Sequence, residues 1–217
     1  MQERKEYMLF GHINVFIKDA LPSHIDMTSV LSTIEKSIPA SFLYDVDTIL
    51  VGHFDDLVTR GVKAAFMDGA IYVTNDQTDN EDIVDDIVHE IAHAVEKLYG
   101  MEIYADGELE QEFLGKKQRF LDILRAYGYN IPNEENLTSE YSKSFDEFVF
   151  FELGYEKAGN MTMGLFITPY ASASISEYFA TGFEAYLLRK EHEYLMKISP
   201  NLFKKLDELT NYSKENY

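Results

Sequence analysis

The first third of the chain carries short apolar runs of strand length, broken by turn-forming residues. The clearest signal is AAFMDGAIYV, where Asp68-Gly69 is a residue pair that suits the tight two-residue turn of a hairpin. This pattern predicts several short strands before residue 78. They are residues 8–17, residues 47–54, and a hairpin whose second strand is 70–75.

Helical periodicity dominates after residue 78. The strongest helix is predicted at about 79–99, where Thr78 and Glu81 form a T-x-x-E capping box and Gly100 is a natural stop. Its apolar residues form one stripe: Val84, Ile87, Val88, Ile91, Val95 and Leu98. The other predicted helices are 27–38 (capped by Asp26 or Thr28, with Pro39 past its end), 108–127, 140–155, 175–197 and a short terminal helix from Pro200.

Two segments between these helices lack helical periodicity. Residues 130–139 predict a polar loop, and GLFITPY at 164–170 predicts a strand or an extended segment. The element order indicates an α+β protein with one domain over residues 1–217. We expect a lobe with a small mixed sheet at about 1–100 and a helical lobe at about 101–217, with an active-site cleft between them.

The composition narrows the function classes. The 217 residues carry a net charge of −19, which argues against nucleic-acid binding because phosphate contacts need a basic surface. The absence of cysteine excludes thiol nucleophiles and cysteine-ligated metal. No membrane-spanning segment or signal peptide is visible, so we expect a cytoplasmic location and no membrane partner, with export by another route left open. The oligomeric state cannot be inferred from the sequence.

Residues 89–93 are HEIAH, an H-E-x-x-H motif within the strongest predicted helix. Residues four apart lie on one helix face, so His89 and His93 can bind the same Zn²⁺. At 100° per residue the two histidines lie nearly opposite the apolar stripe. Glu90 would then lie to one side, where it could serve as the general acid/base of hydrolysis.

A catalytic zinc usually has a third protein ligand. Glu96 and Tyr99 occupy the positions where the pattern H-E-x-x-H-x-x-G-x-x-H needs Gly and His, which excludes that arrangement. Glu177 is one candidate because it lies opposite an apolar stripe of the predicted helix 175–197. Ser174 and Glu177 also fit a capping box, so Glu177 could be only a cap partner. His192, in the charged run RKEHEY, is the other candidate.

The segment PYASASISEYFA at 169–180 resembles the second signature of the anthrax lethal factor catalytic domain and the related Pro-Pro endopeptidases. Together with the H-E-x-x-H motif and the segment SPNLFKKLDEL, this resemblance covers roughly residues 65–217. It implies a zincin-like metallopeptidase fold with one zinc per chain. It also implies that Glu177 is the third ligand and that Tyr170, seven residues earlier, stabilises the oxyanion.

Two features depart from the family. Thr181 stands where the family tends to carry an acid, and 84 positions separate His93 from Glu177, more than the family would predict. The surplus falls at about 135–168, so family substrate preferences are not transferred. In zincin-type peptidases the strand before the metal helix, here 70–75, edges the cleft and pairs with extended substrate.

The resulting prediction is a zinc metalloendopeptidase acting on a protein or peptide substrate, in which Glu90 moves the proton of a metal-activated water. Two alternatives stay open. One is a zinc-binding module without catalysis, although zinc binding alone would not need Glu90. The other is an interaction module without metal, in which the acidic, aromatic-rich surface binds a partner. A delivered toxin and a processing protease are equally compatible with the sequence.

Overall fold

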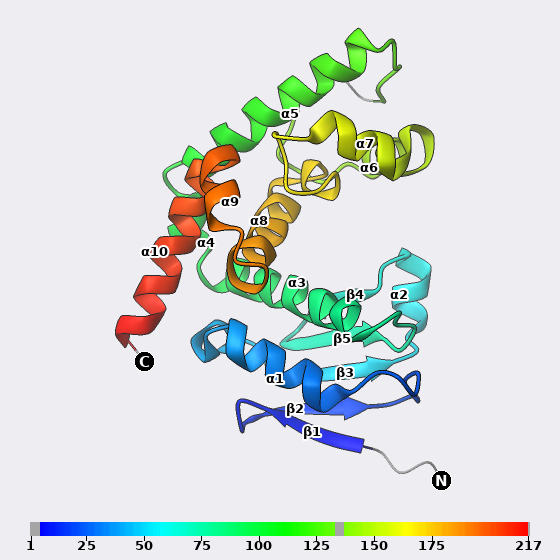
Figure 1. Cartoon of the computed structure of the whole chain (residues 1–217), viewed down its shortest axis with the longest axis vertical. Helices are drawn as coiled ribbons and strands as arrows, with labels where there is room; N and C mark the ends of the chain where they lie inside the picture. Colours follow the sequence, from blue (N-terminus) through cyan, green and yellow to red (C-terminus); the bar gives the residue numbers. More distant parts are fainter. Residues whose placement is uncertain (1–4, 133–136, 217) are drawn as a thin grey trace. The chain divides into compact units, whose positions relative to one another are not determined.

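The computed structural model describes residues 5–132 and 137–216 of the 217-residue chain. They form two compact units, the first made of 5–98 with 210–216 and the second of 99–209 (Figure 1). Residues 133–136 of the predicted polar loop lie outside the described residues, and its remaining residues hold no helix or strand.

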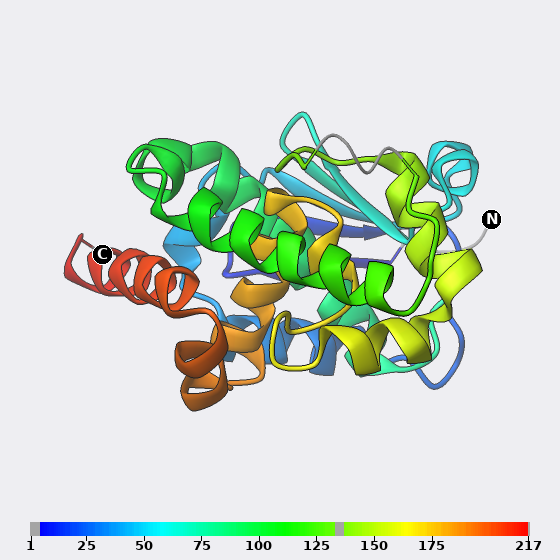
Figure 2. The same cartoon turned by 90° about the horizontal axis from the view of Figure 1, so that it is seen from above.

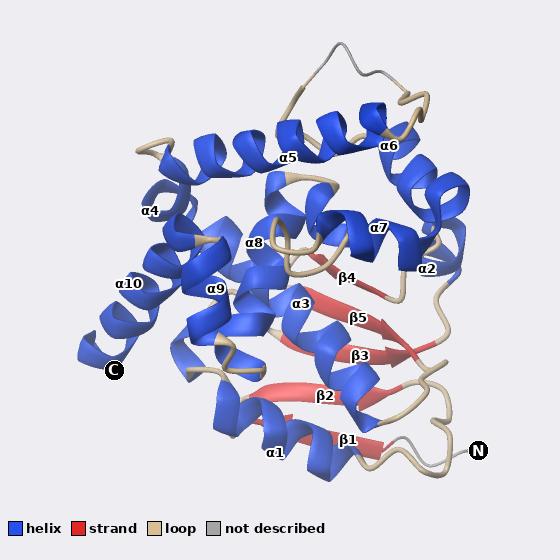
Figure 3. Ribbon diagram, turned by 45° about the horizontal axis from the view of Figure 1, so that its top comes forward, coloured by secondary structure: helices blue, strands red, loops and turns tan. Residues whose placement is uncertain are grey.

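A five-stranded mixed sheet forms the centre of the first unit (Figure 3). The three middle strands are parallel, and each edge strand runs antiparallel to its neighbour. The strand order is β1 (Lys5–Leu9), β2 (Ile13–Ile17), β3 (Thr48–Gly52), β5 (Ala70–Thr74) and β4 (Ala64–Met67). The predicted strand at 47–54 and the hairpin around Asp68-Gly69 are confirmed.

The prediction of one strand at 8–17 is wrong, because these residues contribute to the two strands of a hairpin. Phe10 and Gly11 form its turn with φ of 52° and 73°. Positive φ at both central residues gives the backbone twist that joins antiparallel strands most tightly. Phenylalanine is a rare residue in that conformation, so the apolar run concealed the turn.

Two long helices lie side by side on one face of this sheet (Figures 1 and 3). The first, α1 (Met27–Ser37), is capped by Asp26, whose side chain accepts from the N–H of Thr28 at 3.0 Å. The second, α3 (Asn80–Leu98), carries the H-E-x-x-H motif. Two short helical segments were not predicted, η1 (Ala40–Leu43) and α2 (Asp55–Arg60).

The start of α3 corrects the predicted capping box by one residue. Asp79 accepts from the N–H of Asp82 at 2.9 Å, and Asp82 in turn accepts from the N–H of Thr78 at 3.1 Å. Aspartate caps a helix as well as threonine does, and here Asp79 takes the cap position in place of Thr78.

The second unit contains helices and no strand among its described residues. Figure 2 shows α5 (Glu108–Ala126) running through it, with α6 (Lys143–Glu147) and α7 (Tyr155–Thr162) beside it. Its other elements are α4 (Gly100–Tyr104), the π-helix η2 (Phe148–Gly154), the 3₁₀-helix η3 (Tyr170–Ser172), α8 (Ile175–Phe183), the π-helix η4 (Glu184–Leu188) and α9 (His192–Ile198). The last helix, α10 (Pro200–Asn216), begins in this unit, and its residues 210–216 group with the first.

Two further predictions fail in this unit. Residues 164–170 form turns that end in η3 instead of a strand. The long helix 175–197 is interrupted after η4, where Lys190 takes a φ of 57°. The left-handed conformation of Lys190 ends one helix and allows the next to start in a new direction. The helices predicted at 108–127 and within 140–155 are confirmed.

The described residues thus show an α+β protein with a mixed five-stranded sheet. Over residues 5–132 and 137–216, no helix combines the length and apolar character that crossing a membrane requires.

Candidate metal centre

His89 and His93 project from successive turns of α3. Their ring centroids are 4.9 Å apart, and both side chains are partly buried. The apolar stripe of the same helix is buried, with Ile87, Val88 and Ile91 inaccessible to solvent. The helix therefore packs through one face and presents both imidazoles on another, as its periodicity predicts.

Glu96 is the partner of His93. Its Oε2 lies 3.2 Å from Nδ1 of that ring, one turn further along α3. An ionised carboxylate only accepts hydrogen bonds, so this contact favours the tautomer in which Nδ1 carries the proton and Nε2 has the lone pair for a metal. The pairing of Glu96 with His93 was not predicted, although their spacing of three residues places both on one face of a helix.

Asp86 lies one turn before His89. Its carboxylate accepts from Gln77 Nε2 at 2.9 Å, and burial raises the pKa of Asp86 to about 6, against the opposing effects of the Gln77 hydrogen bond and the His89 charge. A carboxylate at this place can fix the orientation of an imidazole ligand.

Glu90 is buried, and its Oε2 accepts a hydrogen bond from the backbone N–H of Phe66 at 2.6 Å. Phe66 belongs to β4, which is the edge of the sheet. This corrects the expectation that strand 70–75 forms the edge, since β5 pairs with a strand on both sides. Because β5 pairs with β3 on one side, β4, the first strand of the hairpin, lies at the edge of the sheet.

Glu177 lies in the first turn of α8. Ser174 caps this helix by accepting from the backbone N–H of Glu177 at 3.1 Å. This hydrogen bond uses the main chain of Glu177 and not its carboxylate. The hydroxyl of Thr181, at the position where an acid was expected, donates to the Glu177 carbonyl at 2.8 Å and is therefore committed to the helix backbone.

Tyr170, at the start of η3, forms a hydrogen bond with Glu177. Burial and then the charge of Glu177 raise the pKa of Tyr170, which keeps the phenol protonated and able to donate. A second phenol was missed by the sequence analysis. Tyr141 donates to Asp146 at 2.8 Å, burial and this bond raise its pKa to about 12, and the charge of Glu177 acts on both residues.

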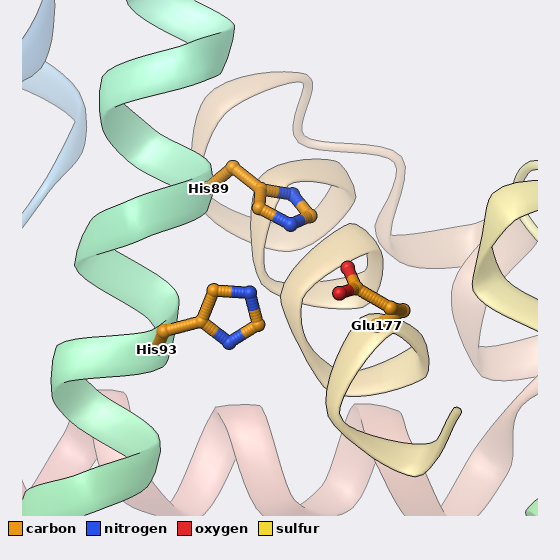
Figure 4. A group of neighbouring side chains, drawn as sticks. All are labelled: His89, His93 and Glu177. Atoms are coloured by element: carbon orange, nitrogen blue, oxygen red, sulfur yellow. The ribbon is translucent and has the colours of Figure 1, made fainter. Parts of the chain in front are cut away.

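Figure 4 shows His89 and His93 on α3 and Glu177 on α8. One ligand atom from each residue lies within 4.8 Å of the others, and this group could hold a metal ion. The group does not include His192, the rival third ligand. The Nε2 of His192 instead pairs with the carbonyl of Tyr186 at 2.8 Å, and its ring stacks on that tyrosine with centroids 4.3 Å apart.

Comparison of this chain with protein-family models, curated proteins and solved structures finds no match. The resemblance to the lethal factor and Pro-Pro endopeptidase family therefore stays a prediction from short motifs.

Proposed function

We propose that this protein is a zinc-dependent metalloendopeptidase of the zincin type. The observation that carries the proposal is the grouping of His89, His93 and Glu177, because two imidazoles and one carboxylate are a typical donor set of hydrolytic zinc. Ligand atoms around a tetrahedral zinc lie about 3.3 Å apart, so modest side-chain rotations would bring this group to that size. One zinc per chain would supply Lewis-acid activation of water and of the peptide carbonyl.

The residues around this group support the hydrolysis of a peptide bond. Glu90 follows His89 directly, and a buried carboxylate can take a proton from the attacking water and return it to the leaving amine. The Phe66 N–H holds one oxygen of Glu90, which limits the rotation of that carboxylate. Tyr170 keeps its proton and can donate to the oxyanion of the tetrahedral intermediate.

Zinc content tests the proposal directly. Wild type, Glu177→Ala and His192→Ala would be loaded with zinc, washed with a mild chelator and measured by elemental analysis, with circular dichroism as the check on folding. We expect about one zinc per chain in the wild type and in His192→Ala, and a clear loss in Glu177→Ala. A wild type without zinc after reconstitution would overturn the proposal and favour the interaction module. Zinc retained in Glu177→Ala would remove that residue from the ligand set.

A further inference from the structure

Glu112 on α5 joins three parts of the second unit. Its carboxylate accepts from the hydroxyl of Tyr178 at 2.8 Å and from the backbone N–H groups of Asn201 at 2.8 Å and Leu202 at 3.1 Å. The last two belong to the first turn of α10, where N–H groups have no partner within the helix and a negative charge is favoured. Glu112 therefore caps α10 and holds Tyr178 with the same carboxylate.

Tyr178 is tightly packed on the side of its ring as well as at its hydroxyl. It is fully buried, and its ring lies 5.7 Å from that of Phe113 and 5.8 Å from that of Phe166 between centroids. The ammonium of Lys116 lies 5.0 Å from the centre of the same ring.

Lys116 is itself anchored, which makes this packing rigid. Its ammonium donates to the carbonyls of Leu165 at 2.8 Å and Ile198 at 2.5 Å and to the hydroxyl of Ser199 at 2.6 Å. Leu165 precedes η3, and Ile198 and Ser199 precede α10. The three N–H groups of this one buried ammonium therefore connect both segments to α5.

The fixed tyrosine is the immediate neighbour of Glu177. Successive side chains on a helix differ by about 100° in direction, so holding Tyr178 sets the rotation of α8 about its axis and the direction of the Glu177 carboxylate. One turn later, Gly182 lies so close to Leu202 that a Cβ there would overlap its side chain. The absence of a side chain at Gly182 therefore lets α8 pack closely against the start of α10.

We propose that Tyr178, held by Glu112, is a positioning residue that orients Glu177 for the metal. The inference rests on the proposed function, because it concerns the third ligand of the same site. Tyr178 and Glu112 lie 66 positions apart, so no short sequence motif would identify this role. The predicted consequence is a loss of metal affinity when the tyrosine hydroxyl is removed, beyond any loss of stability.

The chain offers a matched control in Tyr186. Its hydroxyl donates to Asp207 of α10 at 2.8 Å and its side chain is also buried, but it lies nine positions after Glu177. Zinc dissociation constants of wild type, Tyr178→Phe and Tyr186→Phe would be measured by competition with a chromophoric chelator, and thermal unfolding would be followed on the same samples. We expect about tenfold weaker zinc binding in Tyr178→Phe, in the range known for residues that orient ligands. Tyr186→Phe should lose a comparable hydrogen bond and keep the zinc affinity within about twofold.

Equal zinc affinity in Tyr178→Phe and wild type would overturn this inference and leave the proposed function intact. So would an equal loss of affinity in both variants, since the effect would then follow stability alone. A wild type that binds no zinc would overturn the proposed function, and this inference with it.

Discussion

The helices α3 and α8 both carry members of the candidate ligand group, but they are stabilised in different ways. In α3 the apolar stripe, the cap and the carboxylate partner of His93 all lie within or beside one stretch of 19 residues. In α8 only nine residues are helical, and its orientation depends on Glu112 and on the start of α10. The orientation of a helix that carries a candidate ligand can therefore be specified by local sequence, as in α3, or by contacts distant in the chain, as in α8.

The largest expected effect concerns Glu90 of α3 in the proposed hydrolysis. Glu90→Gln should lower peptide hydrolysis by about 10²–10⁴-fold, the usual contribution of a general acid/base, because an amide cannot accept the proton of water. Zinc-loaded wild type and variant would be incubated with a proteome-derived peptide library, and new termini would be counted by mass spectrometry.

The matched control for Glu90→Gln is Glu81→Gln, an exposed residue of the same helix. This control should cleave like the wild type, and both variants should keep the wild-type zinc content. Undiminished cleavage by Glu90→Gln would remove this residue from the catalytic role.

The next effect tests whether the surroundings of α8 depend on Lys116. Lys116→Met should lower the free energy of unfolding by about 3 kcal/mol, because three acceptors would lose their donor. Urea unfolding at neutral pH measures this change. Lys143→Met is the control, since that lysine is exposed and makes only a 3.7 Å ion pair with Glu147. A loss below 1 kcal/mol would show that the surrounding structure relaxes.

The same lysine predicts a pH dependence. Burial lowers the pKa of Lys116 from its usual 10.5 to about 8. Between about pH 8 and 10.5 this lysine is protonated in the unfolded chain and largely neutral in the folded one. The unfolded chain therefore binds more protons, and the contribution of Lys116 to the free energy of unfolding rises as the pH increases over this range. Urea unfolding at several pH values should show the difference between wild type and Lys116→Met growing over this range, and a constant difference would contradict the shift.

A smaller effect concerns the partner of His93 within α3. Glu96→Ala should weaken zinc binding by about tenfold, because Nδ1 of His93 would lose its acceptor. Chelator competition measures the change, and Glu81→Ala on the same helix should match the wild type. If Glu96→Ala binds zinc as tightly as the wild type, α3 orients its ligands without this carboxylate.

The smallest effect concerns the cap of α3. Asp79→Ala should cost about 1 kcal/mol of stability, whereas Thr78→Ala should cost less than about 0.5 kcal/mol. Chemical unfolding of both variants distinguishes the cap in the structure from the one that the sequence favoured. A larger loss in Thr78→Ala would restore the capping box of Thr78 and Glu81.

The predictions from sequence succeeded where neighbouring residues carry the information. The helices α1, α3 and α5 follow from periodicity, and the hairpin β4–β5 follows from Asp68-Gly69. They failed at 8–17, at 164–170 and at the end of η4. In two of these places a bulky or charged residue, Phe10 or Lys190, adopts a positive φ that sequence preferences do not favour.

The sequence by itself determined α3 and the common face of His89 and His93, because a spacing of four residues is decided within one turn of helix. Only the tertiary structure decided that Glu177, 84 positions after His93, has a ligand atom within 4.8 Å of theirs, and that His192 does not belong to the group. The same holds for the bond of Tyr178 with Glu112 and for the cluster of Tyr141, Asp146 and Glu177. Contacts of this kind form only when the chain folds and brings distant residues together. The local pattern of residues does not indicate which of these side chains will then be in contact.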